Sequence, residues 1–114
     1  MVIHVVLFRP RADLDGQQRL GLAAAFTNAI REIPSVRRAR IGRRVTHGRG
    51  YELLMRADYP YIAVLEFDDI DGLHSYLAHP AHDELGRRFF ESFEEALMYD
   101  YDADEADVGV AKLL

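Results

Sequence analysis

Tyr76, His79 and His82 place a phenol and two imidazoles within seven consecutive residues, beside Pro80. Phenols and imidazoles donate, accept and transfer protons near neutral pH, which is the chemistry of general acid–base catalysis. Pro80 lacks a backbone N–H and disfavours the helical conformation at His79, yet it suits the first turn of a helix. The sequence therefore predicts that one helix ends at His79 and another begins near Pro80. A helix joint with partly exposed polar side chains is the alternative interpretation of these residues.

The direction of His82 follows from the helix expected after this break. Leu85, Phe89 and Phe93 recur at helical spacing and form its apolar stripe. His82 lies three residues before Leu85, so it begins on the face that carries the core-directed residues. The spacing therefore predicts that the His82 side chain points inward.

His4 is the one polar residue in the apolar, β-branched segment from Val2 to Phe8. This composition is typical of a strand, and both alternate faces of the segment are apolar. A strand that is apolar on both faces is expected to be buried on both. His4 is then either a core histidine that a neighbour satisfies by hydrogen bonding or a residue of a pocket.

The other elements follow from periodicity and from helix-capping signals. Asp15 and Gln18 form a capping-box pair, and the helix that they open is expected to end before Pro34. A strand is expected over 36–45, with a bulge at Gly42, and a connection over 46–60 is expected to contain a helical turn at 52–55. A second strand follows over 61–68. Asp69 or Asp71 then opens a helix that continues after Pro80 to residue 94 or 95, and a last strand is expected over 96–101.

This order predicts an α+β fold of the ferredoxin-like type, βαββαβ, with one four-stranded antiparallel sheet and two helices on one face. The first and third strands are apolar on both faces, so the face without helices also needs a cover. A second copy in a two-fold dimer is the simplest cover, which gives a dimeric α/β barrel and makes the protein its own partner. The domain is expected to span residues 1–102, and the acidic and mixed tail over 103–114 is expected to be loosely ordered or to lie on a partner.

Composition narrows the class of protein. The chain has 114 residues and a formal charge of −5, which argues against a nucleic-acid partner. Six arginines between Arg37 and Arg49 are interpreted as the charged face of an edge strand. The absence of cysteine excludes disulfides and thiolate chemistry. No signal peptide or membrane-spanning apolar segment is recognised, so a cytoplasmic location without a membrane partner is expected.

Several motifs match a known family. They are His4-Val5-Val6-Leu7-Phe8, Ile33-Pro34-Ser35-Val36, Val64-Leu65-Glu66-Phe67, Tyr76-Leu77-Ala78-His79-Pro80-Ala81-His82 and Met98-Tyr99-Asp100-Tyr101. With these motifs, the chain resembles the stress-responsive A/B barrel domain family, or Dabb, over residues 2 to 102. Members of this family form dimeric α+β barrels, so the resemblance implies the same fold and a homodimer.

The resemblance also implies roles for particular residues. A polyketide cyclase of the family closes its substrate by an intramolecular aldol condensation with a Tyr–His pair, and the matching residues here are Tyr76 and His82. His82 would be the general base, Tyr76 would hydrogen-bond the developing enolate oxygen, and His4 would orient or share the proton. Substrate contacts are expected at Tyr61, His79 and Phe89. The chain departs from that enzyme at Tyr61, where the cyclase has a histidine.

Other functions stay open at this stage. The chain is either an enzyme that binds or transforms a small, partly apolar organic molecule, or a non-catalytic, stress-associated binding or structural dimer. His79 and His82 are spaced i, i+3 with acidic residues nearby, as on some metal-binding helices, but Pro80 falls between them. No metal and no cofactor is expected, and nothing in the sequence is specific to haem.

Overall fold

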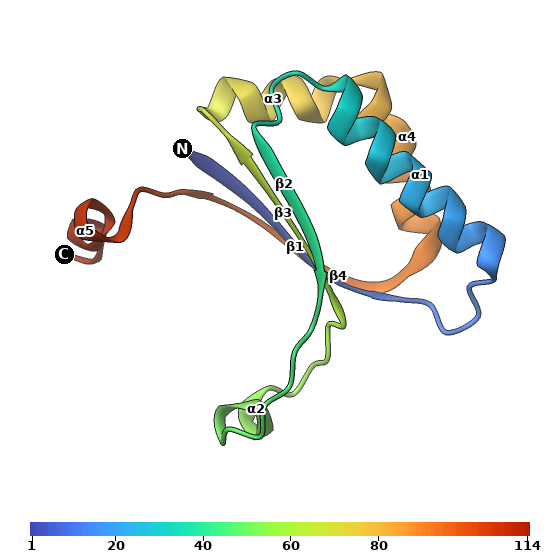
Figure 1. The fold of residues 1–114 in the computed structure, drawn as a ribbon, viewed down its shortest axis with the longest axis horizontal. Helices are drawn as coiled ribbons and strands as arrows, with labels where there is room; N and C mark the ends of the chain where they lie inside the picture. The colour runs from blue at the N-terminus through green and yellow to red at the C-terminus, as the bar shows by residue number, and fades with distance from the viewer.

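A four-stranded antiparallel sheet with strand order β2-β3-β1-β4 forms the centre of the computed structural model, which describes all residues from 1 to 114 (Figure 1). The strands are β1 (Val2–Pro10), β2 (Arg38–Arg43), β3 (Tyr61–Phe67) and β4 (Phe93–Asp102). The helices are α1 (Gly16–Glu32), α2 (Tyr51–Leu54), α3 (Ile70–Ala78), α4 (Pro80–Ser92), α5 (Ala106–Gly109) and a final 3-10 turn (Val110–Leu113). The predicted ferredoxin-like α+β fold is confirmed.

The two faces of the sheet are set by strand register. His4 lies opposite Leu65 of β3 and Asp100 of β4, and directly opposed residues of antiparallel strands point to the same face. We call the face that holds Val2, His4, Val6 and Phe8 the inner face. The helices α1, α3 and α4 all lie on the inner side, whereas the short helices α2 and α5 lie on the opposite, outer side (Figure 1).

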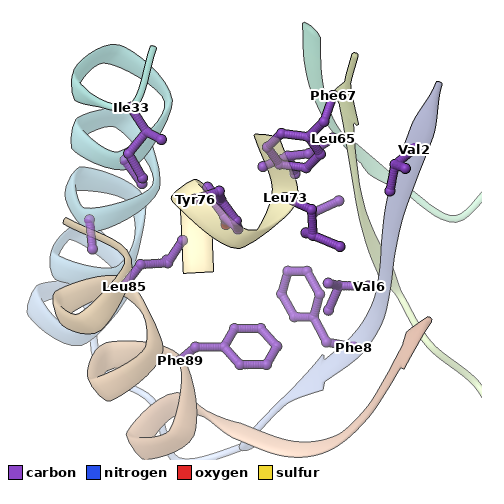
Figure 2. Packing of buried hydrophobic residues seen from close by; sticks show 13 residues of the cluster. Val2, Val6, Phe8, Ile33, Leu65, Phe67, Leu73, Tyr76, Leu85 and Phe89 are labelled. Carbon is purple, nitrogen blue, oxygen red and sulfur yellow. The ribbon is translucent and has the colours of Figure 1, made fainter. Parts of the chain in front are cut away.

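The core lies between the inner face and these three helices. Phe8, Leu65 and Phe67 project from the strands toward Leu85 and Phe89 of α4 (Figure 2). Small side chains let α1 come close to its neighbours, since Ala29 is completely buried. Burying a large apolar side chain stabilises a fold by about 1.5–3 kcal/mol, so this layer is the main source of stability.

Helix α1 begins and ends where its capping residues predict. The Gln18 backbone N–H donates to Asp15 Oδ1 at 2.8 Å, and the Asp15 N–H donates to Gln18 Oε1 at 3.0 Å. This reciprocal pair is the predicted capping box. The helix ends at Glu32, before Pro34, which would lack a donor for another helical turn.

Two predicted details are wrong. The last long helix does not reach residue 94 or 95, because α4 ends at Ser92 and Phe93 already begins β4, three residues before the predicted strand. Phe93 pairs with Pro10, so the strand partner decides where the helix ends. The predicted bulge at Gly42 is also absent, since β2 and β3 pair in unbroken register there, and the irregularity lies instead between Arg9 and Pro10.

The tail after β4 is folded rather than loose. It forms α5 and the 3-10 turn, and Lys112 ties it to the end of β4 through ion pairs with Asp102 at 3.1 Å and Asp104 at 3.0 Å. Its apolar side chains nevertheless face solvent, with Leu113 87% exposed. The tail therefore has local order, and Val110 and Leu113 of the tail border an open hollow together with Ile3 and Val5 of β1.

The outer face of the sheet has no helix over it (Figure 1). Ile3, Val5 and Leu7 alternate with the buried residues of β1 and are only half-buried, and Tyr99 and Tyr101 on β4 are exposed. The radius of gyration is 15.6 Å. A compact domain of this length would have a value of about 13 Å, and the arms that carry α2 and α5 account for the excess. None of the helices has the length and apolar content of a membrane span.

Candidate active site

A cavity of about 150 Å³ lies between the inner face of the sheet and the helices. Ten of its thirteen lining residues are hydrophobic, and the lining contains no lysine, arginine, aspartate or glutamate. The lining residues are His4, Val6, Phe26, Ala63, Leu65, Tyr76, Leu77, His82, Leu85, Gly86, Phe89, Phe90 and Met98. A cavity of this size and chemistry accepts a small, partly apolar molecule, since an apolar cavity of about 150 Å³ is known to hold a benzene ring.

The three polar side chains of the lining come from three different elements. His4 belongs to β1, Tyr76 to α3 and His82 to α4. The rings of Tyr76 and His82 are 4.7 Å apart between centroids and meet edge to face, and the rings of His4 and Tyr76 are 6.0 Å apart. The structure thus brings together the three residues expected to be catalytic, while their roles in a reaction stay predictions.

The break at Pro80 produces this arrangement. Tyr76 lies in the last turn of α3, and His82 lies in the first turn of α4. Between them His79 adopts an extended conformation, with φ −74° and ψ 140°, as a residue before proline prefers. The change of direction lets both side chains reach one cavity from two helices.

His79 caps the N-terminus of α4. Its Nδ1 accepts a hydrogen bond from the Ala81 backbone N–H at 3.0 Å, so it caps the N-terminus of α4. It is absent from the cavity lining. The assignment of His79 as a substrate-binding residue stays a prediction, with a capping role now visible beside it.

The other two expected substrate contacts lie in different places. Phe89 lines the cavity, where its ring packs against Phe8 at 5.1 Å between centroids. Tyr61 instead stacks on Phe8, with 5.6 Å between ring centroids, and it lines a separate hollow that Met55 also lines. The structure therefore places Phe89, but not Tyr61, against the space beside His82.

Burial separates the acid–base properties of Tyr76 and His82. It raises the pKa of the Tyr76 phenol to about 12, so Tyr76 keeps its proton at neutral pH. Burial also lowers the pKa of His82 below its ordinary 6.5, and the charge of a protonated His4 lowers it further, whereas Asp83 and the Leu77 backbone act in the opposite direction. At neutral pH the pair is a neutral imidazole that accepts a proton, next to a phenol that donates a hydrogen bond.

Asp100 is a site residue to which the sequence assigned no role. Nδ1 of His4 lies 2.6 Å from Asp100 Oδ1, and because a carboxylate only accepts, the imidazole must donate this bond. The bond orients the ring and leaves Nε2 as its other polar atom. Asp100 is 96 positions away in the chain, so only the β1–β4 register could have revealed the pair.

The rim of the cavity is also apolar. Leu77, Phe90 and Met98 line it, and their exposed fractions are 40%, 69% and 43%. Sequence reasoning missed Phe90 and Met98, since an exposed apolar residue carries no signal until its neighbours are known. The cavity thus opens to solvent past apolar side chains, through which an apolar molecule can enter.

A metal centre finds no support in these side chains. No three histidine, aspartate or glutamate side chains are placed to bind one metal ion. The Nδ1 atom of His79 is already engaged in the cap of α4. The polar side chains of the cavity, which are His4, Tyr76 and His82, are suited to proton transfer and hydrogen bonding.

Comparisons with known proteins agree with this architecture. The family model for the stress responsive A/B barrel domain matches residues 2–103. Olivetolic acid cyclase of Cannabis sativa is 23% identical over 100 residues, which cover 88% of this chain and 94% of the cyclase.

Solved structures extend the comparison. Hydroxynitrile lyase from Passiflora edulis has a TM-score of 0.74 at 21% identity, covering 92% of this chain and 94% of the lyase. A ferredoxin-like protein of unknown function from Thermobifida fusca, described as dimeric, has a TM-score of 0.69 at 19% identity, covering 88% of each chain. At these identities the structural likeness establishes the fold alone.

Proposed function

Because the chain belongs to the stress responsive A/B barrel domain family, in which similar chains are catalysts, we propose that it binds and transforms a small, partly apolar carbonyl compound. His82 would be the general base and Tyr76 the hydrogen-bond donor. The observation that carries this proposal is the contact between the two rings, 4.7 Å apart inside an otherwise apolar cavity. Proton transfer by a positioned side chain typically accelerates a reaction by about 10²–10⁴.

The reaction begins with an α-proton of the bound carbonyl compound. The unprotonated nitrogen of His82 takes this proton. The C–H electron pair becomes the C=C bond of an enolate, and the π electrons of the C=O bond move to the carbonyl oxygen, which becomes negatively charged. The Tyr76 O–H donates a hydrogen bond to that oxygen in surroundings from which water is largely excluded, where such bonds are strong. The burial that keeps Tyr76 protonated also keeps it a donor throughout this step.

An aldol reaction follows if the same molecule has a second carbonyl group. The enolate carbon attacks that carbonyl carbon, a C–C bond forms, and the new alkoxide oxygen recovers the proton from His82. His82 thereby returns to its neutral form, and no other reactant is consumed. His4, held by Asp100, would orient the substrate or share the proton from the opposite wall of the cavity.

The lining favours a neutral substrate. A carboxylate moved into this cavity would lose its hydration and find no lysine or arginine in the lining to replace it. Asp100 beside His4 and Asp83 beside His82 add negative charge near both imidazoles. Neutral ketones and aldehydes avoid both penalties.

We also propose that the protein is a homodimer, as the Thermobifida fusca protein is described. The half-buried apolar residues on the outer face would then be covered by the same face of a second copy. A domain of this size buries a limited share of its own surface, so an additional covered face would stabilise it.

Hydrogen–deuterium exchange at the α-carbon of small ketones tests the catalytic role without knowledge of the natural substrate. Acetophenone and acetylacetone, incubated with the protein in heavy water and followed by NMR, should exchange faster than the buffer background. His82→Ala should remove this acceleration, while His74→Ala, at an exposed histidine of α3, should keep it. If the wild type binds these ketones in a thermal-shift assay but never accelerates exchange, the protein is a binding domain and not a catalyst.

A further inference from the structure

Gly86 is a glycine in the interior of helix α4 (Pro80–Ser92). Glycine at such a position lowers the stability of a helix relative to alanine, because its backbone has more freedom to lose on folding. Two structural demands commonly justify a glycine in spite of this cost. They are a positive φ angle and the close approach of another segment of backbone.

Neither demand applies to Gly86. The one residue of this chain with a positive φ is Gly48, in a loop. A Cβ atom placed on Gly86 would have no neighbouring atom within 4 Å, whereas a Cβ atom on Gly21 of α1 would lie 3.2 Å from the Arg88 guanidinium. The missing side chain of Gly86 therefore leaves an open space and does not accommodate a neighbouring segment.

This open space adjoins the cavity of the candidate active site. Gly86 is half-buried and lines that cavity, as do His82, four positions before it, and Phe90, four positions after it. Residues four positions apart lie above one another on the same face of a helix. The three residues thus form a row along α4, from the exposed Phe90 at the rim to His82. Gly86 lies between the opening of the cavity and the proposed base.

A side chain at position 86 would take up the space next to His82. The Cα–Cβ bonds of a helix tilt toward its N-terminus, and in α4 His82 lies on that side of Gly86. Even a methyl group would therefore lean toward the imidazole. Glycine at this position keeps the space beside the proposed base free for part of a substrate.

The sheet side of the cavity is also lined by small side chains. Val6 is paired with Ala63 of β3 and with Met98 of β4, so these three residues lie in one row across the inner face. All three line the cavity, together with the aromatic rings of Phe26 and Phe89. Bare helix backbone on one side and short side chains on the other suit a flat apolar group, and aromatic rings are favourable neighbours for another ring.

We propose that Gly86 determines the substrate specificity of this site, which accepts an aryl ketone with its ring against the α4 backbone at Gly86. The carbonyl oxygen then lies at Tyr76, and the α-carbon lies at His82. This inference rests on the catalytic role proposed above and names part of the substrate. The volume agrees with it, since a cavity of about 150 Å³ holds a benzene ring.

Gly86→Ala separates the stability of the protein from its affinity for an aryl ketone. Without ligand the variant should melt about 4 °C higher than the wild type, because alanine is the better helix former and its methyl group meets no neighbour. Its affinity for acetophenone, measured by isothermal titration calorimetry, should fall by about tenfold or more, the usual effect of one methyl group in a hydrophobic pocket. Hydrogen–deuterium exchange of acetone, which has no ring, should be accelerated as in the wild type.

The matched control is Gly21→Ala, at an interior glycine of α1 that does not line the cavity. It adds the same methyl group to a helix, and the flexible end of Arg88 can move to make room for it. Its affinity for acetophenone should equal that of the wild type. An equal loss of affinity in both variants, or an unchanged affinity in Gly86→Ala, would overturn the role of Gly86.

Measurements on the wild type keep this inference apart from the catalytic one. If the wild type binds acetophenone but accelerates no exchange, catalysis is overturned, and the affinities of the two alanine variants still decide the role of Gly86. If it accelerates exchange of acetone but does not bind acetophenone, the aryl ketone is overturned and His82 remains the base. A wild type that neither binds acetophenone nor accelerates exchange of acetone overturns both.

Discussion

The inner and outer faces of one sheet differ in what covers them. On the inner face, His4, Val6 and Phe8 are buried, and the rings of His4 and Phe8 contact side chains of α1, α3 and α4. On the outer face, the alternate residues Ile3, Val5 and Leu7 are equally apolar yet only half-buried. The composition of β1 is similar on both sides, so the difference comes from what covers each face.

This contrast teaches where polar groups can do chemistry. The inner face is closed by the chain's own helices, so His82 and Tyr76 sit in a small apolar cavity where burial shifts the pKa of both. The outer face has its ionic groups at its edges, in contact with water, where the pKa of Glu95 is lowered by hydrogen bonds from the Tyr59 hydroxyl and from Arg9. We therefore propose acid–base chemistry for the first face and recognition of a partner for the second.

The largest expected difference between the two faces comes from placing the same negative charge on neighbouring residues of β1. Val6→Asp puts an unpaired carboxylate among buried apolar side chains, which should cost several kcal/mol and unfold the domain. Val5→Asp changes the outer face and should instead give a folded monomer. Circular dichroism and sedimentation velocity on the two variants check this, and equal loss of structure in both would contradict the distinction between the faces.

A smaller effect is expected when the Tyr76 hydroxyl is removed from the cavity on the inner side of the sheet. Tyr76→Phe keeps the buried ring but removes the donor to the enolate, so α-proton exchange should fall by about 10², while the melting temperature changes little. Tyr101→Phe removes a hydroxyl from the exposed outer face and should leave the exchange rate unchanged. Equal rates in the wild type and Tyr76→Phe would remove Tyr76 from the mechanism.

The smallest expected effect is a dependence of stability on pH that belongs to His82. Its pKa in the folded protein lies below the unfolded value of 6.5, so the unfolded chain binds more protons in the interval between the two values. The stabilisation of neutral His82 is thus complete above 6.5 and is lost as the pH falls toward the folded pKa.

Denaturant unfolding of the wild type and His82→Gln across this interval tests the sign. The wild type should lose more stability on acidification than the variant, which has no imidazole to protonate at this site. The exchange activity should decline over the same interval, as His82 becomes charged and can no longer accept a proton. A wild-type stability that rises on acidification relative to the variant would mean that His82 is charged and paired, not neutral and buried.

The local elements and the character of their faces follow from short stretches of the chain. The capping pair of Asp15 and Gln18, the stop before Pro34 and the helix break at Pro80 are all decided by neighbouring residues. Hydrogen bonds of this kind form over three or four positions, so their pattern is written in short segments. The apolar residues at alternate positions of β1, which are Ile3, Val5 and Leu7, likewise predicted an apolar outer face that needs a cover.

Which side chains meet depends on contacts between segments that are distant in the sequence. His4 and Asp100 pair because β1 and β4 adopt one register among several, and a shift by one residue would turn Asp100 to the other face. The end of α4 at Ser92 is set by strand pairing of Phe93, not by its helical periodicity. Strand register and the packing of helices on a sheet depend on contacts between distant segments, so no short stretch of sequence contains them.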